Sequence, residues 1–209
     1  MTRPDPVEGA GDGAVVVGPG DPALGSSDDL SVLAVALGAH VPADAEQEAT
    51  RARMAEFAAG HPDALHRSCA AGHFTGSALV VDAERRHVLV LFHTKLQRWL
   101  QPGGHTDGEA NLAATALREA TEETGIDGLR VVLPAVDLDI HEVRPPKEEP
   151  HLHLDVRYVV VAPPGARLQG NHESEALRWI DPTELEALGA DEGLLRLCRR
   201  GLAVARTLT

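Results

Sequence analysis

From residue 74 onward, short segments of alternating or continuous apolar residues predict β-strands. Residues 74–82 (FTGSALVVD) and 86–93 (RHVLVLFH) are separated by three residues, an interval typical of a hairpin. A Pro-Gly-Gly turn follows at 102–104. Further strands are predicted at 129–143, 151–162 and 178–180.

Helix formers with an apolar face, bounded by capping residues, predict the helices. Residues 110–124 (ANLAATALREATEET) are the clearest helix, and Gly125 ends it. Asp181 as N-cap and Pro182 at the first helical position begin another. The remaining helices are predicted at 29–39, 43–59 and 190–207.

The order of these elements predicts an α+β fold, a sandwich with a mixed β-sheet. We expect the main domain at residues 72–207. Residues 29–66 are expected to form a helical N-terminal extension that packs on this domain, because two short helices hold no core alone. Residues 1–28, rich in Gly, Pro, Asp and Ser, are expected to be a disordered tail.

Composition limits the classes of function. The 209 residues include 19 Lys+Arg against 32 Asp+Glu, a net charge of −13, with 3 % aromatic residues. An acidic chain poor in aromatic residues does not suit a nucleic-acid polymer as partner. No apolar run reaches the roughly 20 residues of a membrane helix, and no signal peptide is recognisable. Two cysteines, Cys69 and Cys198, are too few for a disulfide framework, so we expect a cytoplasmic protein.

Three carboxylates fall on one face of the predicted helix at 110–124. Glu119, Glu122 and Glu123 are spaced i, i+3 and i+4, one helical turn apart. Like charges this close repel each other unless a cation or an arginine lies among them. Carboxylate oxygens favour Mg²⁺ or Mn²⁺. A solvated acidic face is the alternative interpretation.

The surrounding sequence resembles the Nudix box, a family pattern of Gly, five residues, Glu, seven residues and R-E-U-x-E-E-x-G-U, where U is apolar. Its second half is complete from Arg118 to Ile126 (REATEETGI). In its first half Gly104 is in place, but Ala110 stands where the family has Glu, and Glu109 lies one position early. The resemblance implies a Nudix α/β/α sandwich and hydrolysis of a diphosphate linked to another group.

The resemblance also implies roles for individual residues. Glu119, Glu122 and Glu123 would hold Mg²⁺ against the diphosphate, with Glu119 and Glu122 as catalytic groups. Arg118 would brace the acidic cluster, and Gly125 would end the helix.

Other candidates lie outside the complete half of the box. Glu173 resembles an extra Glu that many relatives carry before a later strand, which implies a general base, with a solvated loop carboxylate as the alternative. The turn at 103–108 (GGHTDG) resembles a bacterial branch of the family. Glu109 and Asp107 are alternative replacements for the missing box carboxylate. Candidates for substrate contact are Lys95, Arg98, Gly104 and Asp107.

Histidines suggest a second metal site. His151, His153 and Asp155 alternate in HLHLD and would project from one face of a strand. Imidazoles with a carboxylate suit Zn²⁺, Mn²⁺ or Fe²⁺, whereas a half-exposed polar strand face is the alternative. His73 opens the first core strand, and His105 follows the Gly-Gly turn.

The order of these histidines resembles isopentenyl-diphosphate isomerases, which share the Nudix fold. Those enzymes hold a metal with histidines before the first core strand and in a Gly-His turn, plus carboxylates on a later strand. Here His151 and His153 stand in place of the carboxylates, and the catalytic Cys of that turn is absent. The resemblance therefore implies a metal site at His73, His105, His151 and His153 without the isomerase reaction.

The sequence predicts a Mg²⁺- or Mn²⁺-dependent pyrophosphohydrolase that cleaves a nucleoside diphosphate linked to another group, or a related diphosphate. One alternative is a metalloenzyme that uses the histidine site on a non-nucleotide substrate. Another is a catalytically silent ligand sensor. The expected partner is a small-molecule diphosphate, and a homodimer is compatible with the family resemblance.

Overall fold

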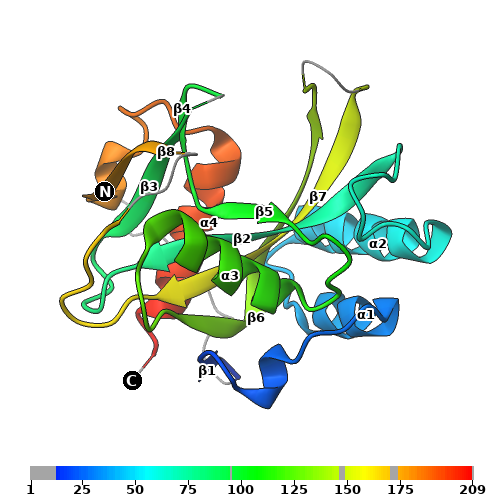
Figure 1. Cartoon of the computed structure of the whole chain (residues 1–209), viewed down its shortest axis with the longest axis horizontal. Coiled ribbons are helices and arrows are strands. Elements are labelled where there is room, and N and C mark those ends of the chain that lie inside the picture. Colours follow the sequence, from blue (N-terminus) through cyan, green and yellow to red (C-terminus); the bar gives the residue numbers. More distant parts are fainter. Residues whose placement is uncertain (1–12, 95, 146–148, 170–173, 209) are drawn as a thin grey trace, which may run out of the picture.

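The computed structural model describes residues 13–94, 96–145, 149–169 and 174–208. These residues build a mixed sheet of eight strands, in which β2 (Gly72–Val81) and β7 (His151–Val161) run parallel (Figure 1). The order is β1-β6-β7-β2-β3-β4, with β5 also against β2 and β8 against β3. The other strands are β1 (Val15–Val17), β3 (Val88–His93), β4 (Arg98–Leu100), β5 (Gly103–His105), β6 (Arg130–Val143) and β8 (Ser174–Ile180). The 3-10 turns are η1 (Pro22–Leu24) and η2 (Pro182–Glu184).

Helices cover both faces of the sheet. On β2, Phe74 and Val80 belong to the core beneath α3 (Leu112–Thr124), whereas Leu79 belongs to the core beneath α4 (Glu192–Ala205). Because alternate strand residues point to opposite faces, the two helices lie on opposite sides of the sheet (Figure 1). This arrangement confirms the predicted α/β/α sandwich with a mixed sheet.

Local chemistry fixes the position of α3. Asn111 caps its N-terminus by accepting a hydrogen bond from the third helical N–H, and Gly125 ends it at a φ of +63°. Ala116 and Ala120 are fully buried, so the helix approaches the sheet closely. A Cβ on Gly76 of β2 would lie 3.1 Å from the backbone nitrogen of Ala116. Small residues on both elements therefore bring the acidic helix against β2.

Two N-terminal helices, α1 (Leu30–Ala39) and α2 (Ala45–Gly60), pack against β6 (Figure 1). The buried Gln47 of α2 hydrogen-bonds the backbone of Leu138 through both atoms of its amide. Side-chain to backbone hydrogen bonds thus join these helices to the sheet.

The expected disordered tail is wrong for residues 13–28. β1 pairs antiparallel with β6, with Val15 opposite Leu133, and η1 follows it. The partner strand lies more than a hundred residues away in sequence, so the local composition gave no sign of the pairing. Residues 1–12 lie outside the described residues.

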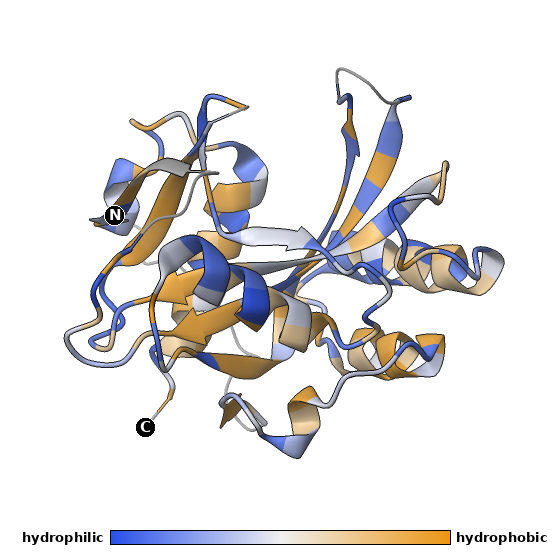
Figure 2. Cartoon of the chain, viewed as in Figure 1, coloured by the Kyte–Doolittle hydropathy of each residue, from blue (hydrophilic) through white to orange (hydrophobic). Residues whose placement is uncertain are grey.

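Figure 2 shows apolar residues concentrated on the strands that α3 covers. It also shows hydrophilic and hydrophobic residues alternating on the projecting ends of β6 and β7. Within the described ranges, each helix is too short or too polar to cross a membrane.

Candidate active site

Arg118 lies among the three carboxylates of α3. Its Nη1 is 2.7 Å from Glu119 Oε1 and 3.3 Å from Glu122 Oε2. Its Nη2 donates a 2.9 Å hydrogen bond to the carbonyl oxygen of His105, which joins the helix to β5. The Glu119 side chain is 15 % exposed and that of Glu122 57 %, whereas Glu123 is buried. One guanidinium thus offsets repulsion within the carboxylate cluster Glu119, Glu122 and Glu123.

The backbone of β5 lies against two of these carboxylates. The Gly103 N–H donates a 2.9 Å hydrogen bond to Glu123 Oε2. A Cβ on Gly104 would lie 2.6 Å from Glu119 Oε1, closer than any real side chain allows. The β5 backbone therefore contacts two carboxylates of α3, Glu123 through the Gly103 N–H and Glu119 through the space that Gly104 leaves.

The carboxylate cluster fits a hard divalent cation. Its donors are oxygens, which Mg²⁺ and Mn²⁺ prefer, and they lie within one helical turn beside a strand backbone. The space next to Gly104, which a Cβ would fill, is occupied by the Glu119 carboxylate. Glu119, Glu122 and Glu123 are therefore the residues that would hold such an ion.

Glu109 does not join the carboxylate cluster as a replacement for the missing box glutamate. Its Oε1 accepts hydrogen bonds from the backbone N–H groups of Ser27 at 3.0 Å and Asn111 at 2.7 Å. Ala110, at the family's Glu position, is fully buried and donates its N–H to the Ser27 carbonyl. This part of the box therefore anchors the N-terminal segment to the start of α3.

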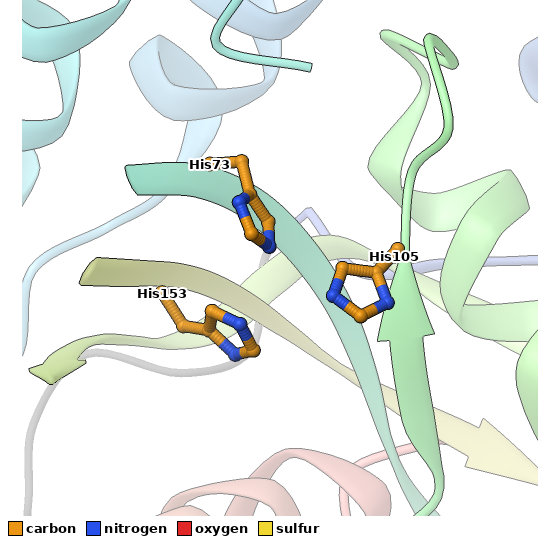
Figure 3. Close-up of side chains that lie close together, drawn as sticks. All are labelled: His73, His105 and His153. Carbon is orange, nitrogen blue, oxygen red and sulfur yellow. The ribbon is translucent and has the colours of Figure 1, made fainter. Parts of the chain in front are cut away.

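Three histidines from three strands converge elsewhere on the sheet (Figure 3). His73 of β2, His105 of β5 and His153 of β7 each offer a nitrogen, and these nitrogens all lie within 4.8 Å of one another. His73 and His153 are direct partners in the parallel pairing of β2 and β7. His73 is 1 % exposed, and neither of its ring nitrogens has a hydrogen-bond partner among the described residues.

The environment keeps His73 and His153 neutral. Burial, together with the nearby His105 and His151, lowers the pKa of His73 to about 4. Burial and the neighbouring His73 and His141 lower the pKa of His153 to about 3. At neutral pH the rings of His73 and His153 therefore each keep one nitrogen lone pair, which metal binding requires.

His151 and Asp155 flank His153 on β7 but have other contacts. The His151 ring lies 5.0 Å from that of His73, and its Nδ1 donates to the Glu149 carbonyl at 2.8 Å. Asp155 is buried, accepts hydrogen bonds from the Thr75 and Ser77 hydroxyls, and pairs with Arg157 at 2.6 Å. Asp155 is therefore a structural acceptor beside the histidines.

The two clusters lie on opposite sides of β5. Gly104 faces Glu119 of α3, whereas the next residue, His105, has its ring 4.9 Å from that of His73. Successive strand residues point to opposite faces, so this separation follows from the alternation. The histidines share the side of the sheet on which α4 packs.

The remaining sequence candidates are dispersed. Arg98 forms an exposed ion pair with Asp191 at 3.0 Å, and Asp107 pairs with Arg67 at 2.9 Å. Lys95 and Glu173 lie outside the described residues.

Sequence reasoning missed a buried ionic network beside the histidines. Its acidic members are Asp137 and Asp139 of β6 and Asp155 of β7, and its basic members are Arg157, Arg196 and Arg200. A signal was present, because Asp137, Asp139 and His141 alternate with the apolar Leu138 and Ile140. Asp139 accepts a 2.8 Å hydrogen bond from His141 Nδ1. The network thus reaches the edge of the histidine cluster.

A mixed sheet between two helices, with carboxylates of one helix against a Gly-Gly strand, defines a Nudix-type protein. Residues 73–199, more than half of the chain, match the family model described as the NUDIX domain. The chain therefore belongs to the Nudix family, a class of hydrolases that act on phosphoric anhydride bonds.

Solved structures share this fold. A NUDIX family hydrolase from Clostridium perfringens is 23 % identical, with a TM-score of 0.53 over 64 % of this chain and 97 % of that one. A C. elegans Ap4A hydrolase is 17 % identical, with a TM-score of 0.53 over 65 % and 98 % of the two chains. An E. coli dihydroneopterin triphosphate pyrophosphohydrolase is 15 % identical, with a TM-score of 0.50 over 62 % and 94 %. No curated protein matches in sequence.

Proposed function

We propose that this chain is a metal-dependent pyrophosphohydrolase that cleaves a nucleoside diphosphate linked to another group, or a related small-molecule diphosphate. The observation that carries this proposal is the carboxylate cluster of α3, braced by Arg118 and seated against the Gly-Gly strand. Two fold relatives are named for Ap4A and for dihydroneopterin triphosphate, which supports a phosphoric anhydride as substrate.

The carboxylate cluster is suited to Mg²⁺ or Mn²⁺, which when bound screens phosphate charge and lowers the pKa of a water molecule. The Gly103 N–H holds the Glu123 carboxylate. Arg118 holds the Glu119 carboxylate, which occupies the space that a Cβ on residue 104 would take. These contacts hold two donors in place before substrate arrives, which lowers the reorganisation that catalysis requires.

Glu122 is the most exposed carboxylate of the cluster. It is therefore the member best placed to face substrate and to accept a proton from the attacking water. Arg118 contacts Glu119, Glu122 and the β5 backbone, so we assign it a positioning role. Glu173 as general base and Lys95 as phosphate contact stay proposals from the sequence.

The test is hydrolysis of the phosphoric anhydride bond in a panel of substrates, followed by chromatography of the two phosphorylated products. Purified protein with Mg²⁺ or Mn²⁺ is incubated with nucleotide sugars, dinucleotides, nucleoside di- and triphosphates, coenzyme A and prenyl diphosphates. Glu122→Gln is expected to lower kcat by about 10²- to 10⁴-fold, the range for losing a general base. Glu56→Gln, an exposed change on α2, is the matched control and should leave kcat unchanged.

Turnover that survives Glu122→Gln would contradict the assigned chemistry. If the same turnover disappeared in a His153→Gln variant, the alternative metalloenzyme at the histidine cluster would replace the proposal.

A further inference from the structure

His73 is a buried polar residue, and none of its contacts with the described residues explains why a polar side chain is buried there. It is 1 % exposed, and both its ring nitrogens lack a hydrogen-bond partner among the described residues. Buried polar atoms in native proteins are almost always paired, because leaving one unpaired forfeits its interaction with water. A metal ion bound to a ring nitrogen of His73 would be such a partner.

The surroundings supply further ligands for such an ion. The nitrogens of His73, His105 and His153 lie within 4.8 Å of one another. Three nitrogens around a tetrahedral Zn²⁺ lie about 3.4 Å apart, given bonds of about 2.1 Å. Small rotations about χ1 and χ2 of each histidine can bring the nitrogens from the observed separation to that of a zinc site. His105 and His153 are half-buried, which leaves the cluster accessible from solvent.

We propose that His73, His105 and His153 form a binding site for a transition-metal ion of the imidazole-preferring class, with Zn²⁺ as the best match. Three neutral imidazoles suit Zn²⁺ or Fe²⁺ and are poor ligands for Mg²⁺. Three protein ligands also leave a coordination position open to water or to a ligand oxygen, as in catalytic zinc sites.

Two neighbouring histidines pack against His153. His151 Nδ1 donates to the Glu149 carbonyl, and its ring centre lies 5.5 Å from that of His153. His141 Nδ1 bonds Asp139 Oδ2, and its ring centre lies 5.6 Å from that of His153. Because each of these rings is held by a hydrogen bond of its own, the two rings limit the space in which the His153 ring can turn.

This site is independent of the proposed hydrolysis. It lies across β5 from the carboxylate cluster, and its nitrogen donors differ from the oxygen donors of Glu119, Glu122 and Glu123. The two clusters should therefore take different metals, and removing one ligand set should leave the other site intact.

The test is direct metal binding by the full-length protein after chelator treatment. Co²⁺ is titrated while the visible absorption of low-coordinate Co²⁺ is recorded, and Zn²⁺ is then added to displace it. We expect one equivalent bound by the wild type and by Glu122→Gln. His87→Gln, a change at an exposed histidine paired with Asp82, is the matched control and should bind equally. His153→Gln and His105→Gln should bind at least tenfold more weakly.

Circular dichroism and the melting temperature establish that each variant is folded. If His153→Gln does not fold, the half-buried His105→Gln decides the question. Zn²⁺ should raise the melting temperature of the wild type more than that of the folded histidine variant. Equal Co²⁺ binding by wild type and histidine variants, absence of binding by the wild type, or equal loss in Glu122→Gln would each overturn the proposal.

Discussion

At the scale of single residues, the missing side chain of Gly104 determines where Glu119 lies. A Cβ at this position would lie 2.6 Å from Oε1 and 2.7 Å from Oε2 of the carboxylate. The carboxylate would have to turn away from β5, and its 2.7 Å ion pair with Arg118 would change with it. The residue at position 104 of β5 therefore determines the position of the Glu119 carboxylate oxygens of α3.

Gly104→Ala is expected to lower kcat on the order of 10²-fold, because displacements of about 1 Å at an active site have such effects. The fold should persist, since the displaced atoms are the end of a flexible side chain. Activity and the melting temperature are compared with Gly38→Ala on α1, where an added Cβ meets no atom within 4 Å. An active, folded Gly104→Ala enzyme would contradict this role.

The site residues that could be grouped from the sequence are those that are close both along the chain and in space. Arg118 and the three carboxylates share one helix, so their spacing alone places them on one face. Glu109 is different, because its carboxylate bonds the N–H of Ser27, 82 residues away. Sequence spacing does not reveal such a contact.

At the scale of elements, the N-terminal helices protect an edge of the sheet. Beyond its short pairing with β1, the outer side of β6 has no strand partner among the described residues. Gln47 of α2 accepts from the N–H of Leu138 at 3.0 Å and donates to its carbonyl at 2.9 Å. His40 Nδ1 donates to the carbonyl of Ala135 at 2.8 Å. Side chains thus do what an additional strand would do, and cover the edge.

Gln47→Leu should destabilise the protein by about 2 kcal/mol, because the buried N–H of Leu138 loses its partner. The carbonyl of Leu138 keeps a 3.4 Å contact with Arg196, which limits the loss. Urea denaturation measures the free energy of unfolding, with the exposed Arg53→Leu on the same helix as control. Equal stabilities of the two variants would show that the edge needs no such capping.

Elements were predictable to the extent that their signals are local. The helix expected at 110–124 is observed at Leu112–Thr124, with the predicted glycine at its end. β1 was missed because three valines in a Gly-rich segment become a strand only through β6. The bulge that shifts the β6–β7 register between Val132 and Asp137 likewise depends on tertiary contacts.

At the scale of the whole molecule, ion pairs join β6 and β7 to α4, and α4 to the start of α2. Asp137 is fully buried and accepts from Arg157 of β7 and from Arg196 and Arg200 of α4. Arg200 also reaches Asp44, the N-cap of α2, at 2.6 Å. Removing one buried partner leaves an uncompensated charge, so this network resists separation of α4 from the sheet.

The network makes stability depend on acid pH. Burial raises the pKa of Asp139, but hydrogen bonds from His141 and Arg196 and the charge of Arg157 outweigh it and lower that pKa well below its usual value. As pH falls through about 4, Asp139 therefore becomes protonated in the unfolded chain while it stays ionised in the folded protein. The free energy of unfolding decreases as a result.

Asp139→Asn should reduce the slope of unfolding free energy against pH between about 5 and 3, by up to about 1 kcal/mol per pH unit. Urea denaturation across this range provides the slope, and Glu56→Gln, an exposed carboxyl, serves as control. Identical slopes in wild type and Asp139→Asn would contradict the stabilised carboxylate.

The placement of the two clusters on either side of β5 has a consequence for evolution. Gly104 faces the helix and His105 faces the other histidines, so the strand serves both clusters through adjacent residues. An insertion or deletion of one residue within Gly103–His105 would exchange these faces and disrupt both. Homologues that retain both clusters should therefore show no length variation in this segment, even where the flanking loops have grown or shortened.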